Sequence, residues 1–516
     1  QADRMRAVTE ILTELPTDPE VIAYRADVLS NLLDDGPLRE RLEALLPLLS
    51  RVVRERRRPI FGTEWTAGQI VDRLGDLEMY VEAALGLEEA LDSPRLPAAA
   101  LRALRDATRE LTGAPEFEAL QAELPVLREQ LDSIQSITIG VNVTHDLRPE
   151  SAAILSLDAE KIEGRSGLLG RLLGREAAQA GITRLRGGAG ASFRGFFPPM
   201  MPNSSGYEND LVRDLQRLID RVVTPLGEAI ERYVWVQTRD FSRLDTELSF
   251  MLHAAGLVRR LRRAGLPMCR PELVPIEERV SFLEEAYHVG LALRTAEDAG
   301  STIVTNSVTF DSEHARVWIL TGPNRGGKTT YSRAVGLAHL LAQAGLYVPA
   351  RTARLSPVDG IWTHFPTLET TTPGEGHLDD EAIRLASIFR DATPRSLILL
   401  NEVLTGTSTL EALALAYDAV RGLHLLGARA IYVTHLHELA RRVDEINAST
   451  CGDGRVGSLT AEVDPTVEAD GGHRRTFRIR IGAPLGISYA SEIAEQHGIS
   501  YTQLVGLLRD RGLIGE

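Results

Sequence analysis

Apolar residues recur at helical spacing over most of the first 295 residues of the chain. One stripe, with the three- and four-residue spacing of an α-helix, consists of Leu38, Leu42, Leu45, Leu49 and Val53. Similar stripes recur over residues 85–131 and 211–293. The pattern predicts a long helical region, and we interpret the leucines of each stripe as helix-packing core.

Two stretches interrupt this helical pattern. Residues 136–157 open with alternating side chains, a period of two that predicts a strand. Residues 165–195 combine glycines with a single acid and six arginines, which are Arg165, Arg171, Arg175, Arg184, Arg186 and Arg194. Three aromatic residues, Phe193, Phe196 and Phe197, stand at the end of this segment or directly after it. Arginines contact phosphates and aromatic rings stack on bases, so this segment is a candidate DNA-binding surface. A solvated, flexible insertion is the alternative interpretation.

From residue 302 onward, strands and helices alternate with short loops, which is typical of a mostly parallel α/β sheet. This change places a domain boundary near residue 295. Toward the C-terminus, residues 459–463 and 476–481 predict a hairpin, and two short helices are expected over residues 489–511. The chain is therefore predicted to join a mostly α-helical region, with a small insertion, to a C-terminal α/β domain.

A complete phosphate-binding motif, G-x-x-x-x-G-K-[ST], joins the predicted strand 317–321 to the helix that follows. Its residues are Gly322, Pro323, Asn324, Arg325, Gly326, Gly327, Lys328 and Thr329. Backbone N–H groups as far as Thr330 can cradle phosphate oxygens, Lys328 can reach the β and γ phosphates, and the Thr329 hydroxyl can ligate Mg²⁺. The chain has only two lysines, Lys161 and Lys328, among 57 basic residues. The motif predicts binding of ATP with Mg²⁺.

A second buried strand, residues 396–400, ends in Asn401 and Glu402. Glu402 stands where a general base orients the attacking water in a nucleotide hydrolase. Asn401 stands where a metal-ordering Asp is expected. Its uncharged oxygen can still hold a metal-bound water, but the lost charge predicts weaker Mg²⁺ binding.

A third strand, residues 430–433, ends in Thr434 and His435. This placement lets the His435 imidazole sense a γ-phosphate. The order of loop, strand with Asn-Glu, and strand with Thr-His predicts a composite site of the ABC ATPase type. Lys328, Glu402 and His435 are its candidate catalytic residues.

These motifs resemble the ATPase domain of the MutS mismatch-repair family. The resemblance rests on residues 321–331, 345–350, 402–409 and 434–439, and it extends upstream to Asn306, where the family holds an Asn near the nucleotide. More weakly, residues 24–33 and the helical blocks resemble the core and lever domains of the family, and residues 139–142 and 147–150 are similar to its type-two branch. The family acts as ATP-gated dimers that close around DNA, so the resemblance implies ATP and Mg²⁺ as ligands, DNA as partner and a homodimer.

The resemblance assigns a role to each part of the chain. Residues 1–136 and 209–295 are expected to form core and lever helices, and residues 137–208 a small clamp insertion with the basic segment. Residues 296–516 are expected to form the ABC-type P-loop ATPase domain, whose last helices mediate dimerisation. We also expect that the protein lacks a mismatch-reading domain before the core and a nuclease domain at the C-terminus.

The chain departs from the family pattern in three places. Asn401 replaces the family's Asp, and Leu404 stands where the family has Gly. Gly376 and His377 occupy the place of a Ser-Thr pair that reaches the γ-phosphate across the dimer, although Glu381 fits a family acid. With Glu402 present and no charge at Asn401, slow ATP hydrolysis is predicted.

Composition and net charge limit the kind of nucleic-acid surface, the redox compartment and the membrane segments that can be expected. The net charge of −15 requires any nucleic-acid surface to be a local basic patch on an acidic protein. Two cysteines, Cys269 and Cys451, argue against a disulfide framework and favour a reducing cytoplasm. The sequence has no run of 18 apolar residues, which argues against a membrane-spanning segment.

Three functions fit parts of these observations. The leading hypothesis is an ATP-dependent DNA-binding protein of MutS type, a dimeric clamp linked to mismatch repair or recombination control. The alternative is a nucleotide-switched scaffold that binds a protein partner and has vestigial ATPase activity, which Asn401 and Gly376 favour. A small-molecule nucleotide kinase is disfavoured by the strand ending in His435 and by the long helical region.

Overall fold

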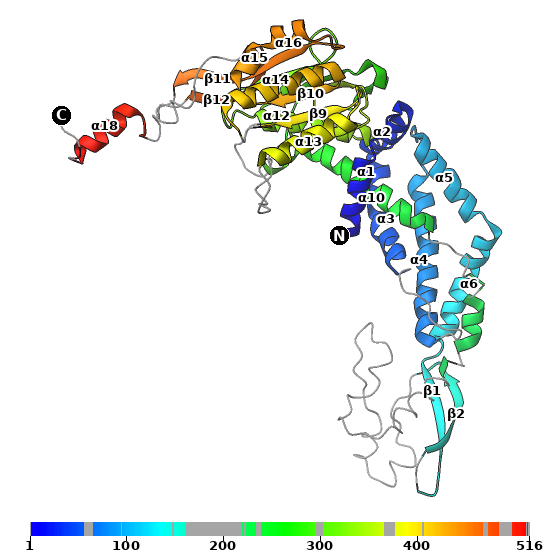
Figure 1. Cartoon of the computed structure of the whole chain (residues 1–516). Helices are drawn as coiled ribbons and strands as arrows, with labels where there is room; N and C mark the ends of the chain where they lie inside the picture. The colour runs from blue at the N-terminus through cyan, green and yellow to red at the C-terminus, as the bar shows by residue number, and fades with distance from the viewer. Residues whose placement is uncertain are drawn as a thin grey trace. The chain divides into compact units, whose positions relative to one another are not determined.

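The computed structural model describes residues 2–55, 66–93, 95–146, 149–160, 219–220, 223–230, 232–233, 239–295, 303–365, 377–404, 407–467, 473–483, 498–511 and 513. The chain divides into two compact units (Figure 1). The first unit comprises Gln1–Gly36, Leu96–Ala100 and Phe250–Glu516, and the second comprises Pro37–Arg95 and Leu101–Ser249. The six arginines predicted to contact DNA lie outside the described residues.

A six-stranded sheet forms the centre of the first unit, in the order β12-β11-β6-β10-β9-β8. Its strands are β6 (Val317–Thr321), β8 (Ile361–His364), β9 (Leu397–Asn401), β10 (Arg429–Val433), β11 (Val456–Val467) and β12 (His473–Ile481). Neighbouring strands run parallel except for β11 and β12, which form an antiparallel hairpin. The mostly parallel sheet and the C-terminal hairpin predicted from the sequence are therefore confirmed.

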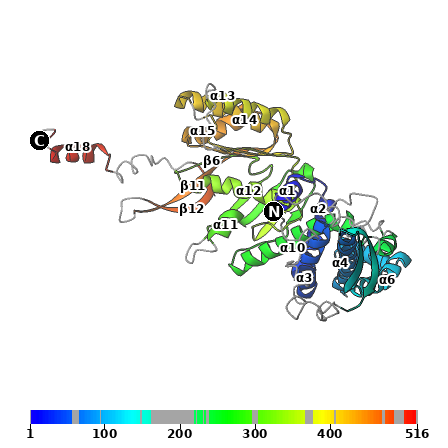
Figure 2. The same ribbon diagram turned by 90° about the horizontal axis from the view of Figure 1, so that it is seen from below.

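Helices cover both faces of this sheet. Figure 2 shows α13, α14 and α15 on one side of β6 and α12 on the other. The described helices of the unit are α1 (Ala2–Thr13), α2 (Pro19–Asp34), α11 (Val289–Thr295), α12 (Lys328–Gln343), α13 (His377–Asp391), α14 (Thr409–Leu426), α15 (His437–Arg441), α16 (Val443–Ser449) and α18 (Tyr501–Asp510). The C-terminal part of α10 (Arg239–Arg263) and a 3₁₀ turn, η2 (Ile276–Glu278), also belong to it. Among the helices in the described ranges, none is long and apolar enough to cross a lipid bilayer.

A second sheet in the first unit has four strands, in the order β3-β7-β4-β5. Its strands are β3 (Glu272–Leu273), β4 (Ser281–Ala286), β5 (Asn306–Phe310) and β7 (Thr352–Leu355). The helical pattern predicted over residues 211–293 is thus wrong at β3 and β4. Burial along the first part of β4 alternates, with Ser281 and Leu283 inside and Phe282 exposed, but hydrophobicity does not alternate, so the sequence hid the strand.

The boundary expected near residue 295 falls inside this unit. β4, upstream of that position, pairs with β5 and with β7, both downstream of it. Strand pairing buries backbone hydrogen-bonding groups, so β4 belongs to the same unit as the α/β part of the chain.

Arg429, the first residue of β10, is fully buried and ties the loops of the second sheet to the first. Its guanidinium donates to the Ser281 hydroxyl at 3.1 Å. It also donates to the carbonyl oxygens of Val280, Ser356, Pro357 and Arg395, at 3.0, 2.8, 2.8 and 3.3 Å. Burial lowers the pKa of this guanidinium, and the carbonyl oxygens compensate its lost hydration.

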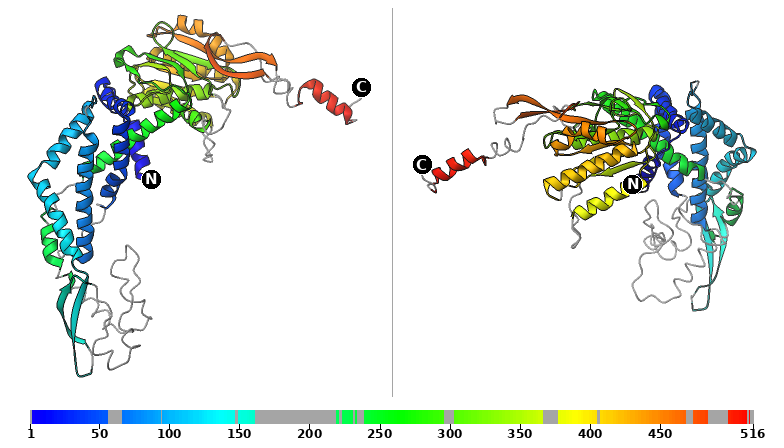
Figure 3. Two further views of the ribbon diagram at one scale, coloured as in Figure 1. Left: turned by 180° about the vertical axis from the view of Figure 1, so that it is seen from behind. Right: turned by 45° about the horizontal axis from the view of Figure 1, so that its top comes forward.

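The second unit consists of long helices and a hairpin (Figure 3). Its described helices include α3 (Gly36–Glu55), α4 (Ala67–Leu91), α5 (Ala99–Thr112), α6 (Pro115–Asp132) and the N-terminal part of α10. The predicted stripe on α3 is buried at Leu38, Leu42, Leu45 and Leu49. Its last core position is Val52 rather than Val53, because a three-residue step from Leu49 keeps the side chain on the buried face.

The hairpin of the second unit consists of β1 (Ser136–Val143) and β2 (Pro149–Asp158). The two strands pair antiparallel, with Ser136 opposite Asp158 and Ile137 opposite Leu157. The strand predicted over residues 136–157 is therefore confirmed as two paired strands.

Candidate nucleotide-binding site

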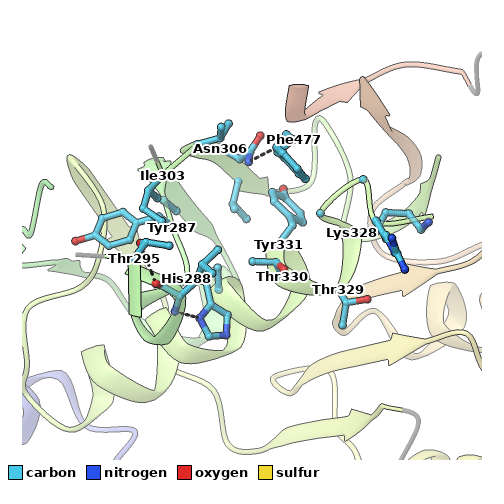
Figure 4. A pocket seen from close by; sticks show the side chains of 18 of the residues that line it. Tyr287, His288, Thr295, Ile303, Asn306, Lys328, Thr329, Thr330, Tyr331 and Phe477 are labelled. Atoms are coloured by element: carbon cyan, nitrogen blue, oxygen red, sulfur yellow. Dashed lines mark hydrogen bonds between the residues drawn. The ribbon is translucent and has the colours of Figure 1, made fainter. Parts of the chain in front are cut away.

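A cavity of about 370 Å³ lies in the first unit, beside the P-loop. One end is lined by residues 324–330 and by Glu402, and the other by residues of α11 and of the segment before it. Figure 4 shows Lys328 and Thr329 at the first end, and His288 and Thr295 at the second. The cavity is large enough for a nucleotide and opens directly onto the phosphate-binding motif.

The P-loop has a backbone conformation that depends on its glycines. Gly322 has a φ of +133° and Gly327, the residue before α12, a φ of +89°. A Cβ atom on Gly322 would lie 2.7 Å from the Cβ of Ala461 on β11. Both positions thus exclude larger side chains, and the loop leads straight into the N-terminus of α12, where backbone N–H groups attract anions.

Lys328, the first residue of α12, is buried at the inner side of this loop. Its ammonium group donates to the carbonyl oxygens of Gly322 and Pro323, both at 2.9 Å. Burial lowers the pKa of Lys328 to about 8, against the opposing effect of the Glu402 charge. The loop itself therefore holds the lysine within the cavity. Phosphate oxygens of a bound nucleotide would replace the two carbonyl oxygens as partners of the ammonium group.

The two residues predicted to order Mg²⁺ are brought together. The Thr329 hydroxyl donates to the side-chain oxygen of Asn401 at 3.0 Å, and Asn401 is the buried last residue of β9. Both side chains offer oxygen atoms, the donor type that Mg²⁺ prefers, so the pair fits this ion in kind. The pair carries no negative charge, which lowers the attraction for a divalent cation.

Glu402 and His435 also meet, at the C-terminal ends of β9 and β10. Nε2 of His435 lies 2.6 Å from Oε1 of Glu402. This hydrogen bond, together with the charges of His435 and Lys328, holds the pKa of Glu402 below its ordinary value despite partial burial. Glu402 is therefore ionised at neutral pH. His435 was predicted to sense a γ-phosphate, and the structure places its imidazole against the predicted base.

Asn306 lines the cavity, but its side chain binds β12. Its Nδ2 donates to the carbonyl oxygen of Phe477 at 3.1 Å, and its Oδ1 accepts from the N–H of Ile479 at 2.7 Å. These bonds hold Phe477 at a φ of +57°, an unusual value for a residue with a side chain. The Phe477 ring lines the cavity beside the P-loop (Figure 4).

Sequence reasoning missed Phe477, Tyr287 and His288 as lining residues. Phe477 is 171 residues away from Asn306, which holds it, and no motif marks either contact. Tyr287 and His288 lie just after β4, in a stretch that the sequence predicted as helix. Only the strand pairing of the second sheet brings them to the site.

The motif, the buried lysine and the paired Glu402 and His435 together define a P-loop nucleotide-binding domain. A protein-family model described as MutS domain V matches residues 318–467, which contain this site. A second model, the MutS2 N-terminal domain, matches residues 17–264. Over these two ranges the chain fits a MutS-like family member, and the second match agrees with the predicted similarity to the type-two branch.

Curated relatives carry the same family name. The DNA mismatch repair protein MutS of Granulibacter bethesdensis is 38% identical over 229 residues, 44% of this chain and 23% of that protein. MutS of Salinibacter ruber is 27% identical over 474 residues, 85% of this chain and 50% of that protein. MutS of Trichormus variabilis is 27% identical over 467 residues, 84% of this chain and 51% of that protein. The chain therefore spans about a quarter to a half of the length of these relatives.

Proposed function

We propose that the protein is an ATP-dependent DNA-binding ATPase of MutS type that hydrolyses ATP slowly. The observation that carries this proposal is the convergence on one cavity of Lys328, the Thr329–Asn401 pair and Glu402. A glycine-rich turn without a ligand has no need of a buried lysine or of an ionised carboxylate beside it.

The P-loop binds and orients the phosphates. Its N–H groups and the N-terminus of α12 face the β and γ phosphates, while the Lys328 ammonium moves from the carbonyl oxygens of Gly322 and Pro323 to phosphate oxygens. A neighbouring phosphate raises the pKa of Lys328 from about 8, so the bound lysine stays charged.

Glu402 acts on the attacking water. Its lowered pKa keeps the carboxylate ready to accept a proton at neutral pH, and His435 fixes its direction. Thr329 and Asn401 would hold Mg²⁺, which supplies positive charge to the phosphate oxygens when bound. Because Asn401 is uncharged, we propose that this support is weak and that turnover is slow.

We further propose that residues 165–195 contact DNA through phosphates. The support is their six arginines against one acid on a protein of net charge −15, together with relatives named as DNA mismatch repair proteins. A protein that contacts DNA mainly through phosphates binds the sugar–phosphate backbone with little base specificity. The clamp insertion at residues 137–208, the levers on either side of it and a role in mismatch repair or recombination control are parts of the same proposal.

Electrophoretic binding to homoduplex, mismatched, branched and single-stranded DNA, with and without ATP and over a salt series, tests DNA binding. We expect affinity that changes with ATP and falls steeply with salt, because bound phosphates release counterions. Binding that is absent on every DNA structure at low salt would refute the proposal.

We propose that the working form is a homodimer stabilised by ATP, since ABC-type sites are completed across an interface. Light scattering on a Glu402→Gln variant with ATP and Mg²⁺ tests this, because the variant retains ATP. A mass that stays monomeric at micromolar protein would contradict it.

The free thiols of Cys269 and Cys451 are consistent with our placement of the protein in the reducing cytoplasm.

The second candidate is a nucleotide-switched scaffold for a protein partner, with vestigial hydrolysis. The uncharged Asn401 at the predicted metal position favours it. The salt series separates the two functions, because phosphate contacts give a steep salt dependence and protein contacts generally do not.

A further inference from the structure

The turn that follows β9 carries Glu402 and has an unusual backbone. Glu402 has a φ of +53° and Leu404 a φ of +64°, both in the left-handed region that favours glycine. The Leu404 side chain is buried in the hydrophobic core of the first unit, so its packing also helps to hold this conformation. Two such residues in one turn persist only where the surrounding structure holds them.

Within the described residues, three hydrogen bonds help to hold this turn. The N–H of Glu402 donates to the carbonyl oxygen of Val433 at 2.9 Å, and the Tyr432 hydroxyl lies 3.4 Å from the carbonyl oxygen of Val403. The N–H of Leu404 donates to Oε2 of Glu381 at 2.8 Å. The first two bonds come from β10, the neighbouring strand. The third comes from a side chain on α13.

Glu381 is placed to hold the turn firmly. Its carboxylate is buried, with the side chain 7% exposed, and Oε1 lies 3.9 Å from Nε2 of His364 at the end of β8. Burial raises the pKa of Tyr432 on β10, and the negative charge of Glu381 adds to this effect. A hydrogen bond from an N–H to a buried carboxylate is stronger than one between neutral groups.

We propose that Glu381 is a positioning residue for ATP hydrolysis. By accepting a hydrogen bond from the N–H of Leu404, Glu381 keeps Leu404 in the left-handed conformation. It thereby fixes the turn that directs Glu402 into the cavity. Glu381 does not line the cavity, so it acts through the backbone of the turn. The inference rests on the proposed ATPase activity of Glu402.

The test uses four variants in the full chain: Glu381→Ala, Glu381→Gln, Leu404→Gly and the double variant Glu381→Ala/Leu404→Gly. Steady-state hydrolysis gives kcat and KM, a fluorescent ATP analogue gives the affinity, and thermal unfolding gives stability. Glycine adopts the left-handed conformation without strain, so Leu404→Gly removes the need for the hydrogen bond. It also removes a buried side chain, and thermal unfolding measures the stability lost in this way.

We expect Glu381→Ala to lower kcat by about tenfold to a hundredfold with KM and analogue affinity unchanged, because small misplacements of a catalytic group have effects of this order. Glu381→Gln keeps an acceptor oxygen and retains most of the activity. Leu404→Gly alone stays near the wild-type kcat. The double variant regains activity relative to Glu381→Ala, which a general loss of stability does not explain.

A wild-type kcat in Glu381→Ala would overturn the inference. So would a loss of kcat that Leu404→Gly fails to restore, because the role would then be structural only. The Glu402→Gln variant separates a failure of the positioning role of Glu381 from a failure of the proposed ATPase function. If Glu402→Gln abolishes hydrolysis while Glu381→Ala is unaffected, only the positioning role fails. If Glu402→Gln hydrolyses ATP like the wild type, the proposed function fails and the inference with it.

Discussion

The Thr329 hydroxyl lies 3.0 Å from the side-chain oxygen of Asn401, so the two residues expected to order Mg²⁺ face each other without a negative charge between them. Glu402, the next residue after Asn401, is ionised and bonded to His435. The site thus combines the proposed base, in its ionised form, with a proposed metal position that carries no charge. That combination is the physical reason for expecting ATP binding with slow turnover.

Asn401→Asp should raise the rate of ATP hydrolysis, because it restores a charge to the metal position. A preorganised electrostatic contact is commonly worth on the order of 10² to 10³ in rate, and we expect a gain toward that range. Hydrolysis measured over a Mg²⁺ titration should also reach half its maximum at a lower Mg²⁺ concentration. If the substitution changes neither quantity while Glu402→Gln abolishes turnover, Asn401 does not limit the reaction.

ATP binding should take up protons above neutral pH. In the free protein the pKa of Lys328 is about 8, lowered by burial, and a bound phosphate raises it. Between about pH 8 and the ordinary pKa of lysine, free Lys328 is largely neutral and bound Lys328 is charged, so binding consumes up to one proton. Calorimetry in buffers of different ionisation enthalpy measures this uptake.

Lys328→Ala is the control for this titration and should abolish ATP binding. Equal ATP affinity in the wild type and in the variant would show that the site is elsewhere. If the wild type binds ATP at pH 9 without taking up protons, the lowered pKa of Lys328 is wrong, but the assignment of the binding site stands.

Arg429→Met should destabilise the first unit by roughly 2 to 4 kcal/mol, because it leaves several buried carbonyl oxygens without their donor. An exposed arginine of α13, Arg390, provides the control, and Arg390→Met should change stability little. Chemical denaturation followed by circular dichroism compares the two variants. Equal stability of both would mean that water replaces the guanidinium at no cost.

Changing Arg184, Arg186 and Arg194 together to Ala should weaken binding to all duplex sequences alike. Each phosphate contact contributes about 0.9 to the slope of log affinity against log salt, so the slope should fall by up to roughly 2.7. A matched charge control changes three exposed arginines of the first unit, Arg351, Arg354 and Arg390. ATP hydrolysis without DNA should survive in both. An unchanged slope in the first variant would move the DNA site to another basic cluster.

The sequence predicted the parts of the site that are local. The strand before the P-loop, the helix after it and the residues following β9 and β10 are each encoded within a few positions, so Lys328, Asn401 and Glu402 were found from motifs. The mostly parallel sheet followed from the alternation of strands and helices.

Contacts over long sequence separations could not be predicted. Asn306 reaches β12 through a bond to a residue 171 positions away, and Glu381 meets Leu404 across a strand and a turn. The pairing of β4 with β5 was hidden because β4 lacks alternating hydrophobicity. In each case, tertiary pairing rather than local propensity decides the structure.

The central claim is that Glu402 activates water for hydrolysis of ATP bound at the P-loop. Single-turnover hydrolysis of radiolabelled ATP by excess protein, for the wild type and for Glu402→Gln, tests it most directly. We expect both proteins to bind ATP, the wild type to release phosphate in one slow phase, and the variant to release none on that timescale. Equal phosphate release by the two proteins would contradict it.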